Sequence, residues 1–135
     1  MSTESDRPIS PEPFVDAEDI ADVAVAALLD DRDVGELYEL TGPRSLTFAE
    51  AVDEISGATG REISYSPISV EDHAAAARQQ GIPEVFVELL SYLFTTVLDG
   101  RNARASDGVR PALGREPRDF SEFARRAAAT GVWDV

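Results

Sequence analysis

The feature that most constrains this chain is the apolar segment from Pro83 to Asp99. Gly81 and Gly100 border it, and proline is well tolerated in a first helical turn because its missing N–H would have no helical partner there. The polar residues of the segment recur at spacings of three and four, which places them in one narrow stripe of a helix. They are Glu84, Glu88, Ser91, Thr95 and Asp99. Nearly every other position is large and apolar, whereas a surface helix shows the reverse proportion.

The predicted helix 83–99 therefore needs to be covered on most of its sides. It is slightly short for a membrane span, and its five polar positions argue further against one. Three roles stay open for it: a core helix, a contact with a partner or a second copy of the chain, or the wall of a ligand pocket. In the last role it would bind an apolar or aromatic small molecule. The pocket residues expected from this helix are Phe86, Leu89, Leu90, Tyr92, Leu93 and Phe94.

Capping residues and hydrophobic spacing predict the other elements. Helices are expected from Asp16 to Asp30, from the capping box Thr47–Glu50 to the glycines at 57 and 60, from Ser69 to Gly81, and from Asp119 onward, with a single turn over 106–113. Short strands are expected at 37–40 and 63–67. A strand, a helix and a strand within about thirty residues form a βαβ unit with parallel strands.

The predicted fold class is α+β and mostly helical, with five or six helices and one small parallel two-stranded βαβ unit. Two strands are too few for an independent sheet, and their open edges invite further strands. We expect one domain over 14–131, a flexible lead-in over 1–13 and a terminal tag over 132–135. Trp133 in that tag is expected either to pack on the domain or to contact another chain.

The charge of the chain limits its partners. The net charge is −14, which disfavours nucleic acid and anionic membranes. Residues 1–100 hold 21 acids and five arginines, whereas residues 101–135 hold seven arginines and five acids. The basic end is expected either to lie against the acidic body or to meet an anionic partner or ligand. The polar, acidic start and the lack of cysteine favour a cytoplasmic protein without disulfides.

Several segments together resemble a known protein family. They are Phe14–Ala21, Tyr38–Pro43, Leu46–Glu50, Gly60–Tyr65 and Gly114–Phe123. Over roughly residues 14–130 the chain is similar to the C-terminal part of NmrA-like atypical short-chain dehydrogenases, a family of NAD(P)-binding proteins. The resemblance implies the smaller, substrate-side lobe, which packs over the nicotinamide end of the cofactor.

The resemblance also implies a nucleotide-binding half, which this sequence does not show. No glycine-rich turn follows a predicted strand, so nothing is expected to hold a pyrophosphate. The chain has no lysine, and with it no Tyr-x-x-x-Lys pair. We therefore expect no cofactor to bind this chain alone, NAD(P) to come only through a partner domain, and no independent NAD(P)-dependent oxidoreductase activity.

The sequence offers few candidate catalytic or metal-binding residues. His73 is the only histidine and could act as an acid or base near neutral pH, and Tyr92 could donate a hydrogen bond to a ligand carbonyl. No cluster at ligand spacing predicts a metal site. Three functions remain open: the substrate-binding lobe of an NmrA-like oxidoreductase acting with a Rossmann-type partner, a self-associating small-molecule-binding or interaction module, and a small cofactor-independent enzyme with an apolar pocket. The expected partner is accordingly a separate Rossmann-type subunit or a second copy in a homodimer.

Overall fold

The computed structural model describes residues 10–134, and over this range the chain is mostly helical, as predicted. The first nine residues of the predicted lead-in lie outside the described residues. Six α-helices occur in the described range: α1 (Ala17–Leu29), α2 (Phe48–Thr59), α3 (Val70–Gln79), α4 (Glu84–Tyr92), α5 (Val109–Leu113) and α6 (Phe120–Ala129). Two short turns, η2 (Asp31–Asp33) and η3 (Leu93–Val97), follow α1 and α4.

The predicted capping residues begin four of these helices. The Asp16 carboxylate accepts a hydrogen bond from the Glu18 N–H at 2.9 Å, which begins α1. Ser69 and Asp119 cap α3 and α6 in the same way. At α2 the Thr47 hydroxyl accepts from the N–H three residues later while the carboxylate of that residue accepts from the Thr47 N–H, so the predicted capping box is confirmed.

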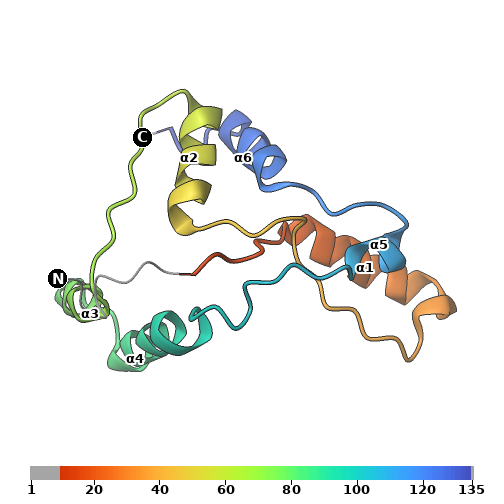
Figure 1. Cartoon of the computed structure of the whole chain (residues 1–135), viewed down its shortest axis with the longest axis horizontal. Coiled ribbons are helices and arrows are strands. Elements are labelled where there is room, and N and C mark those ends of the chain that lie inside the picture. Colours follow the sequence, from red (N-terminus) through yellow and green to blue (C-terminus); the bar gives the residue numbers. More distant parts are fainter. Residues whose placement is uncertain (1–9, 135) are drawn as a thin grey trace.

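The helices lie in three pairs that leave an open centre (Figure 1). Helix α2 packs on α6, α3 packs on α4, and α1 packs on α5. Long segments without helix or strand connect the pairs. The buried apolar side chains are few, and one small cluster of them, Ala74, Ala77 and Val87, joins α3 to α4.

The predicted helix 83–99 forms in two parts. After α4 the chain widens into the π-helical turn η3, in which the Leu98 N–H donates to the Leu93 carbonyl at 2.9 Å. The Thr95 hydroxyl donates to the Ser91 carbonyl at 2.7 Å, a side-chain bond that competes with the regular helical pattern. Within α4, only Val87 is buried. None of the described helices is both long and apolar enough to cross a bilayer. The exposed apolar residues of α4 are Val85, Phe86, Leu89 and Tyr92.

The predicted βαβ unit is not seen in the described residues. Segments 37–40 and 63–67 carry no strand pairing, and the single β-bridge found in this part of the chain joins Glu12 to Leu46 in antiparallel orientation. Segment 39–46 instead packs between residues 12–14 and 103–108. Two strands alone gain little from pairing, because each keeps an open edge and the pair buries no face.

A glycine permits the closest of these chain crossings. The Gly42 N–H donates to the Pro13 carbonyl at 3.1 Å. A Cβ atom at position 42 would lie 1.9 Å from the carbonyl oxygen of Phe14, so a side chain there would displace backbone. Gly42 therefore allows segment 39–46 to lie directly against the segment that leads into α1.

The molecule exposes more surface than its size requires. Its accessible area is 9152 Å². A compact monomer of this mass would expose roughly 6900 Å². Part of the exposed surface is apolar: fourteen large hydrophobic side chains are exposed in the described residues. Two groups of these residues stand out. One lies at and after the C-terminal end of α1 and comprises Leu28, Leu29, Val34 and Leu37, and the other lies on α4.

Candidate functional site

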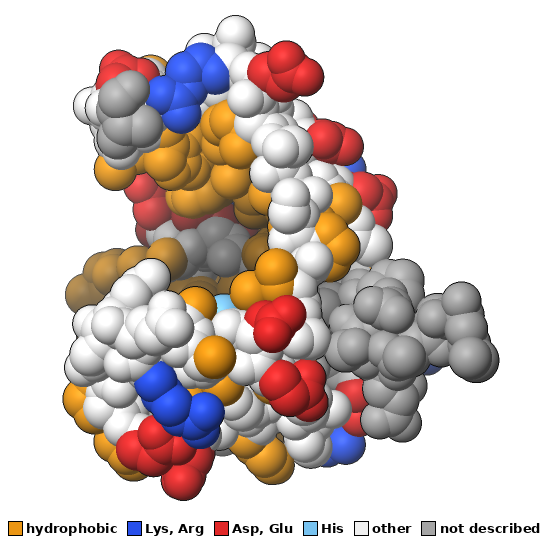
Figure 2. Space-filling view, turned by 90° about the vertical axis from the view of Figure 1, so that its left-hand side faces the viewer, with side chains coloured by type: hydrophobic (Ala, Val, Ile, Leu, Met, Phe, Trp, Pro, Cys, Tyr) orange, Lys and Arg blue, Asp and Glu red, His pale blue; other side chains and the backbone are white. Residues whose placement is uncertain are grey.

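An aromatic cavity of about 710 Å³ lies between the α2–α6 pair and the α3–α4 pair. This volume is within the range of small-molecule sites in proteins. Figure 2 shows the hollow from its open side, with hydrophobic side chains along its walls. Six rings line it: Phe14, Phe48, Tyr65, His73, Phe94 and Phe120.

The first wall of the aromatic cavity is a continuous row of rings. Phe14 lies at its centre, with ring centroids 5.8 Å from Phe48 and 5.4 Å from Phe120. Phe48 continues the row to Tyr65 at 6.4 Å. The rings meet at tilted or edge-to-face angles, the arrangement that aromatic pairs prefer. Because α2 and α6 pack together, their first residues, Phe48 and Phe120, approach Phe14 from two sides.

The second wall comes from α3 and η3. The rings of His73 and Phe94 meet edge to face with centroids 5.3 Å apart. Thr95 and Leu98 extend this wall. The wider turn of η3 thus occurs where the chain lines the cavity, and such π-helical turns are frequent at functional sites.

The structure brings only part of the predicted site to this cavity. His73 and Phe94 line it, whereas Tyr92 is exposed on α4 and is not among the lining residues. The same holds for the remaining predicted pocket residues Phe86, Leu89, Leu90 and Leu93.

Four lining rings were not assigned to a pocket from the sequence. Phe48 and Phe120 lie in the first turns of predicted helices, and Phe14 and Tyr65 lie outside the predicted helices. Their shared signal is modest: each aromatic residue lies within a few positions of a helix N-cap, Phe48 and Phe120 directly after it and Phe14 and Tyr65 before it.

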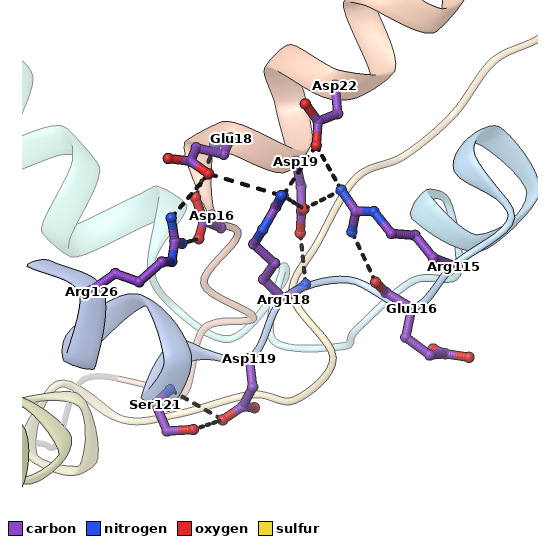
Figure 3. A network of polar contacts seen from close by, with 10 residues as sticks. All are labelled: Asp16, Glu18, Asp19, Asp22, Arg115, Glu116, Arg118, Asp119, Ser121 and Arg126. Atoms are coloured by element: carbon purple, nitrogen blue, oxygen red, sulfur yellow. Dashed lines mark hydrogen bonds and ion pairs between the residues drawn. The ribbon is translucent and has the colours of Figure 1, made fainter.

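A network of ion pairs joins α1 to the segment before α6 (Figure 3). The Asp19 carboxylate is fully buried and accepts from the Arg118 backbone N–H at 2.8 Å and from the guanidinium groups of Arg115 and Arg118 at 2.9 and 2.5 Å. Burial alone would raise the pKa of Asp19, but these hydrogen bonds outweigh it, so its pKa lies below the usual range. Asp22 shares both guanidinium groups.

Further ion pairs lie around the N-terminal caps of α1 and α6. Arg126 pairs with Asp16 and, at 2.9 Å, with Glu18. Arg44 binds both oxygens of Asp119 at 2.7 and 2.9 Å, and this bond holds the pKa of Asp119 well below its usual range. Three arginines of the basic end, Arg115, Arg118 and Arg126, therefore lie against acidic residues at the start of α1.

The described residues do not fit a dinucleotide or a metal ion. A pyrophosphate needs glycines at a helix N-terminus, but Gly60, Gly81 and Gly114 follow the ends of helices. Gly108 precedes the five-residue helix α5 but lies against the Glu39 backbone, and Asp16 and Asp119 place negative charge at the starts of α1 and α6. No group of three or more His, Cys, Asp or Glu residues in the described range is placed to hold a metal.

Comparison with known proteins gives several relatives and no matching family model. The chain is 37% identical over 122 residues to the uncharacterized oxidoreductase YesF of Bacillus subtilis, covering 89% of this chain and 43% of that protein. It is 35% identical over 116 residues to the NAD(P)H azoreductase of Xenophilus azovorans, covering 86% of this chain and 41% of that protein. The chain thus spans about two fifths of the length of these relatives.

Solved structures share the fold. A triphenylmethane reductase of Citrobacter sp., determined with NADP(H), matches with a TM-score of 0.74 at 21% identity, over 89% of this chain and 42% of that one. An NADPH-dependent quinone oxidoreductase of Escherichia coli matches with a TM-score of 0.74 at 20% identity, over 88% and 43%. The relatives and structural neighbours are NmrA-like or NAD(P)-dependent reductases, so the resemblance indicated by the sequence is confirmed.

Proposed function

We propose that this chain is the substrate-binding lobe of an NmrA-like NAD(P)-dependent reductase and that it acts with a nucleotide-binding partner domain. The observation that carries the proposal is the aromatic cavity on a molecule that exposes more surface than a compact monomer does, with many large hydrophobic side chains in it. Exposed apolar surface of this kind marks a site where another protein domain packs. The relatives are about two and a half times as long as the matched region, which leaves room for that body.

The partner domain would supply the cofactor site. Because the described residues do not fit a pyrophosphate, we assign the NAD(P) site to the partner domain. This chain would bind the acceptor among the rings of the aromatic cavity, exclude water from it and orient it toward the partner. The acceptor would be an apolar or aromatic small molecule, in keeping with a predominantly apolar cavity.

The proposal also accounts for segments 37–40 and 63–67, which the sequence predicts as strands but which form no strand pairing in this chain. They would pair with, or lie against, the sheet of the partner domain, which would provide the edge that two isolated strands lack. Leu37 is 95% exposed in the chain alone, as expected for a side chain whose neighbours belong to another domain.

His73 is the acid–base candidate that the cavity favours. Its imidazole lines the cavity beside Phe94, within reach of a bound molecule, and imidazole can give or take a proton near neutral pH. Tyr92 lies on the exposed face of α4 and would contribute only if a partner covers that face.

A self-associating binding module is the alternative, and the exposed face of α4 favours it. Val85, Phe86, Leu89 and Tyr92 form an apolar surface on one helix. A second copy related by a two-fold axis would cover this surface with the same residues. In that case the aromatic cavity would still bind a small molecule, but without hydride transfer.

A chimera tests the proposal. The matching two fifths of the Xenophilus azoreductase are replaced by residues 14–131 of this chain, which is 35% identical to that enzyme. We expect the chimera to bind NADPH and to oxidise it in the presence of an aromatic acceptor, whereas the isolated chain neither binds nor oxidises NADPH. Nicotinamide fluorescence and absorbance measure both. The remaining part of the azoreductase alone is the control.

Two results would contradict the proposal. One is clear binding of NADPH to the isolated chain, which would show a cofactor site that its residues do not suggest. The other is a folded chimera that binds NADPH and reduces none of a panel of azo, quinone and triarylmethane acceptors.

A further inference from the structure

The charged groups of the aromatic cavity have one sign. Glu71 and Asp99 line it, and no arginine is among the lining residues in the described part of the chain. Asp99 is held by Arg101, whose guanidinium nitrogens lie 3.0 and 3.1 Å from the carboxylate. Glu71, in the first turn of α3, has no ion pair among the described residues.

A further carboxylate lies close to this site. One oxygen of Glu12 is buried and has no hydrogen-bond partner in the described residues. Burial first, and the nearby charge of Asp99 second, raise the pKa of Glu12 above its usual value. Glu12 and Asp99 therefore place two carboxyl groups near one another beside the cavity, and the net charge of −14 makes the protein as a whole attractive to cations.

The aromatic walls act in the same direction. The faces of Phe14, Phe48, Tyr65, Phe94 and Phe120 carry negative quadrupole potential, which attracts cations. An anionic ligand would meet two carboxylates and no guanidinium. A cation with its charge spread over flat rings could stack between the two walls and leave its positive edge near Glu71.

We infer that the aromatic cavity takes a flat, delocalised aromatic cation in preference to a neutral or anionic aromatic molecule of the same shape. The inference deepens the proposed function and rests on it, because it specifies the acceptor of that same cavity. It follows from the lining of this chain in the described residues: two aromatic walls, the carboxylates of Glu71 and Asp99, and no arginine.

The test uses one ring system in three charge states. The probes are N-methylacridinium, acridine at mildly alkaline pH where it is uncharged, and acridine-9-carboxylate, each followed by its own fluorescence with the full chain. We expect the cation to bind about tenfold more tightly than acridine and the carboxylate to bind most weakly. Added salt should reduce the difference between the cation and acridine.

A matched pair of variants locates the effect. Glu71→Gln should weaken N-methylacridinium binding about threefold and leave acridine binding unchanged. Asp72→Asn removes the same charge from the neighbouring residue, whose side chain does not line the cavity, and should change neither. Equal effects of the two variants would show a response to overall charge only and would overturn the inference.

The other outcomes distinguish a failure of the inferred charge preference from a failure of the proposed binding role of the cavity. Equal binding of the cation and acridine, or tighter binding of the carboxylate, would overturn the inference about charge and leave the substrate lobe standing. Failure of all three probes to bind, in the chain and in the NADPH-binding chimera, would overturn the binding role of the cavity itself.

Discussion

Asp19 is the residue on which the connection between α1 and the region before α6 depends. Its carboxylate has exchanged water for three N–H donors, one from the backbone and two from guanidinium groups (Figure 3). Arg115 and Arg118 remain partly exposed and share Asp22 as a second acceptor. Removing the Asp19 charge would leave a buried polar group and two guanidinium groups with weaker partners.

We predict that Asp19→Asn lowers the free energy of unfolding by about 3 kcal/mol at neutral pH, as expected for a buried ion pair that loses one partner. Asp22→Asn is the matched control, and because the Asp22 side chain is 46% exposed the change should cost less than about 1 kcal/mol. Urea denaturation followed by circular dichroism measures both. Equal losses in the two variants would contradict the role assigned to Asp19.

The pH dependence of the same variant follows from the lowered pKa of Asp19. A carboxylate with a lowered pKa in the folded state stabilises the fold above its unfolded pKa, and this contribution is lost as the pH falls through the folded value. The difference between the wild type and Asp19→Asn should therefore be full at neutral pH and disappear in strong acid.

At the scale of elements, the sequence predicted where the helices begin, but not the π-helical turn η3 that follows α4. Asp16, Thr47, Ser69 and Asp119 act through atoms two or three residues away, so the sequence contains everything that fixes these caps. The η3 turn could not be predicted in this way, because an apolar segment with a narrow polar stripe is equally compatible with one continuous helix.

The candidate site shows the same division. Phe94 and His73 were singled out from their helices, and both line the aromatic cavity. The opposite wall combines Phe14, Phe48 and Phe120, which lie far apart in the sequence and meet only because α2 packs on α6. Spacing along one helix carries no information about such contacts.

Two valines of α4 give a matched test of which face the chain itself covers. Val87 is 1% exposed and packs on Ala74 and Ala77, whereas Val85 is 67% exposed. We predict that Val87→Ala lowers the free energy of unfolding by about 2 kcal/mol, because it leaves a cavity. Val85→Ala should change it by less than about 0.5 kcal/mol, the usual range for surface positions. Thermal unfolding of both variants measures the contrast, and a larger loss for Val85→Ala would be the opposite of what this packing implies.

At the scale of the whole molecule, the excess surface is the main fact. The buried apolar side chains of the described residues are few, and two groups of exposed apolar residues lie at separate places, one at and after the end of α1 and one on α4. The proposed partner domain accounts for the first of these, next to segment 37–40. A single body does not need to cover both, so the α4 surface remains available for a second copy of the chain.

Leu37→Asp tests the proposed partner surface. In the isolated chain the substitution should change the free energy of unfolding by less than about 0.5 kcal/mol, since the side chain is 95% exposed. In the chimera with the azoreductase, the same aspartate would be buried at the junction without a partner, and we expect a clear loss of thermal stability. Differential scanning fluorimetry of both proteins gives the comparison. An equally small effect in the chimera would place the junction elsewhere.

The contact between Asp19 and the backbone of Arg118 spans 99 positions of the chain. During synthesis on the ribosome, the first helix emerges long before the arginines that neutralise it, and its acidic side chains stay hydrated until then. Since a contact of such long range forms late, α1 acquires these neighbours only after the segment that carries Arg115 and Arg118 has been synthesised.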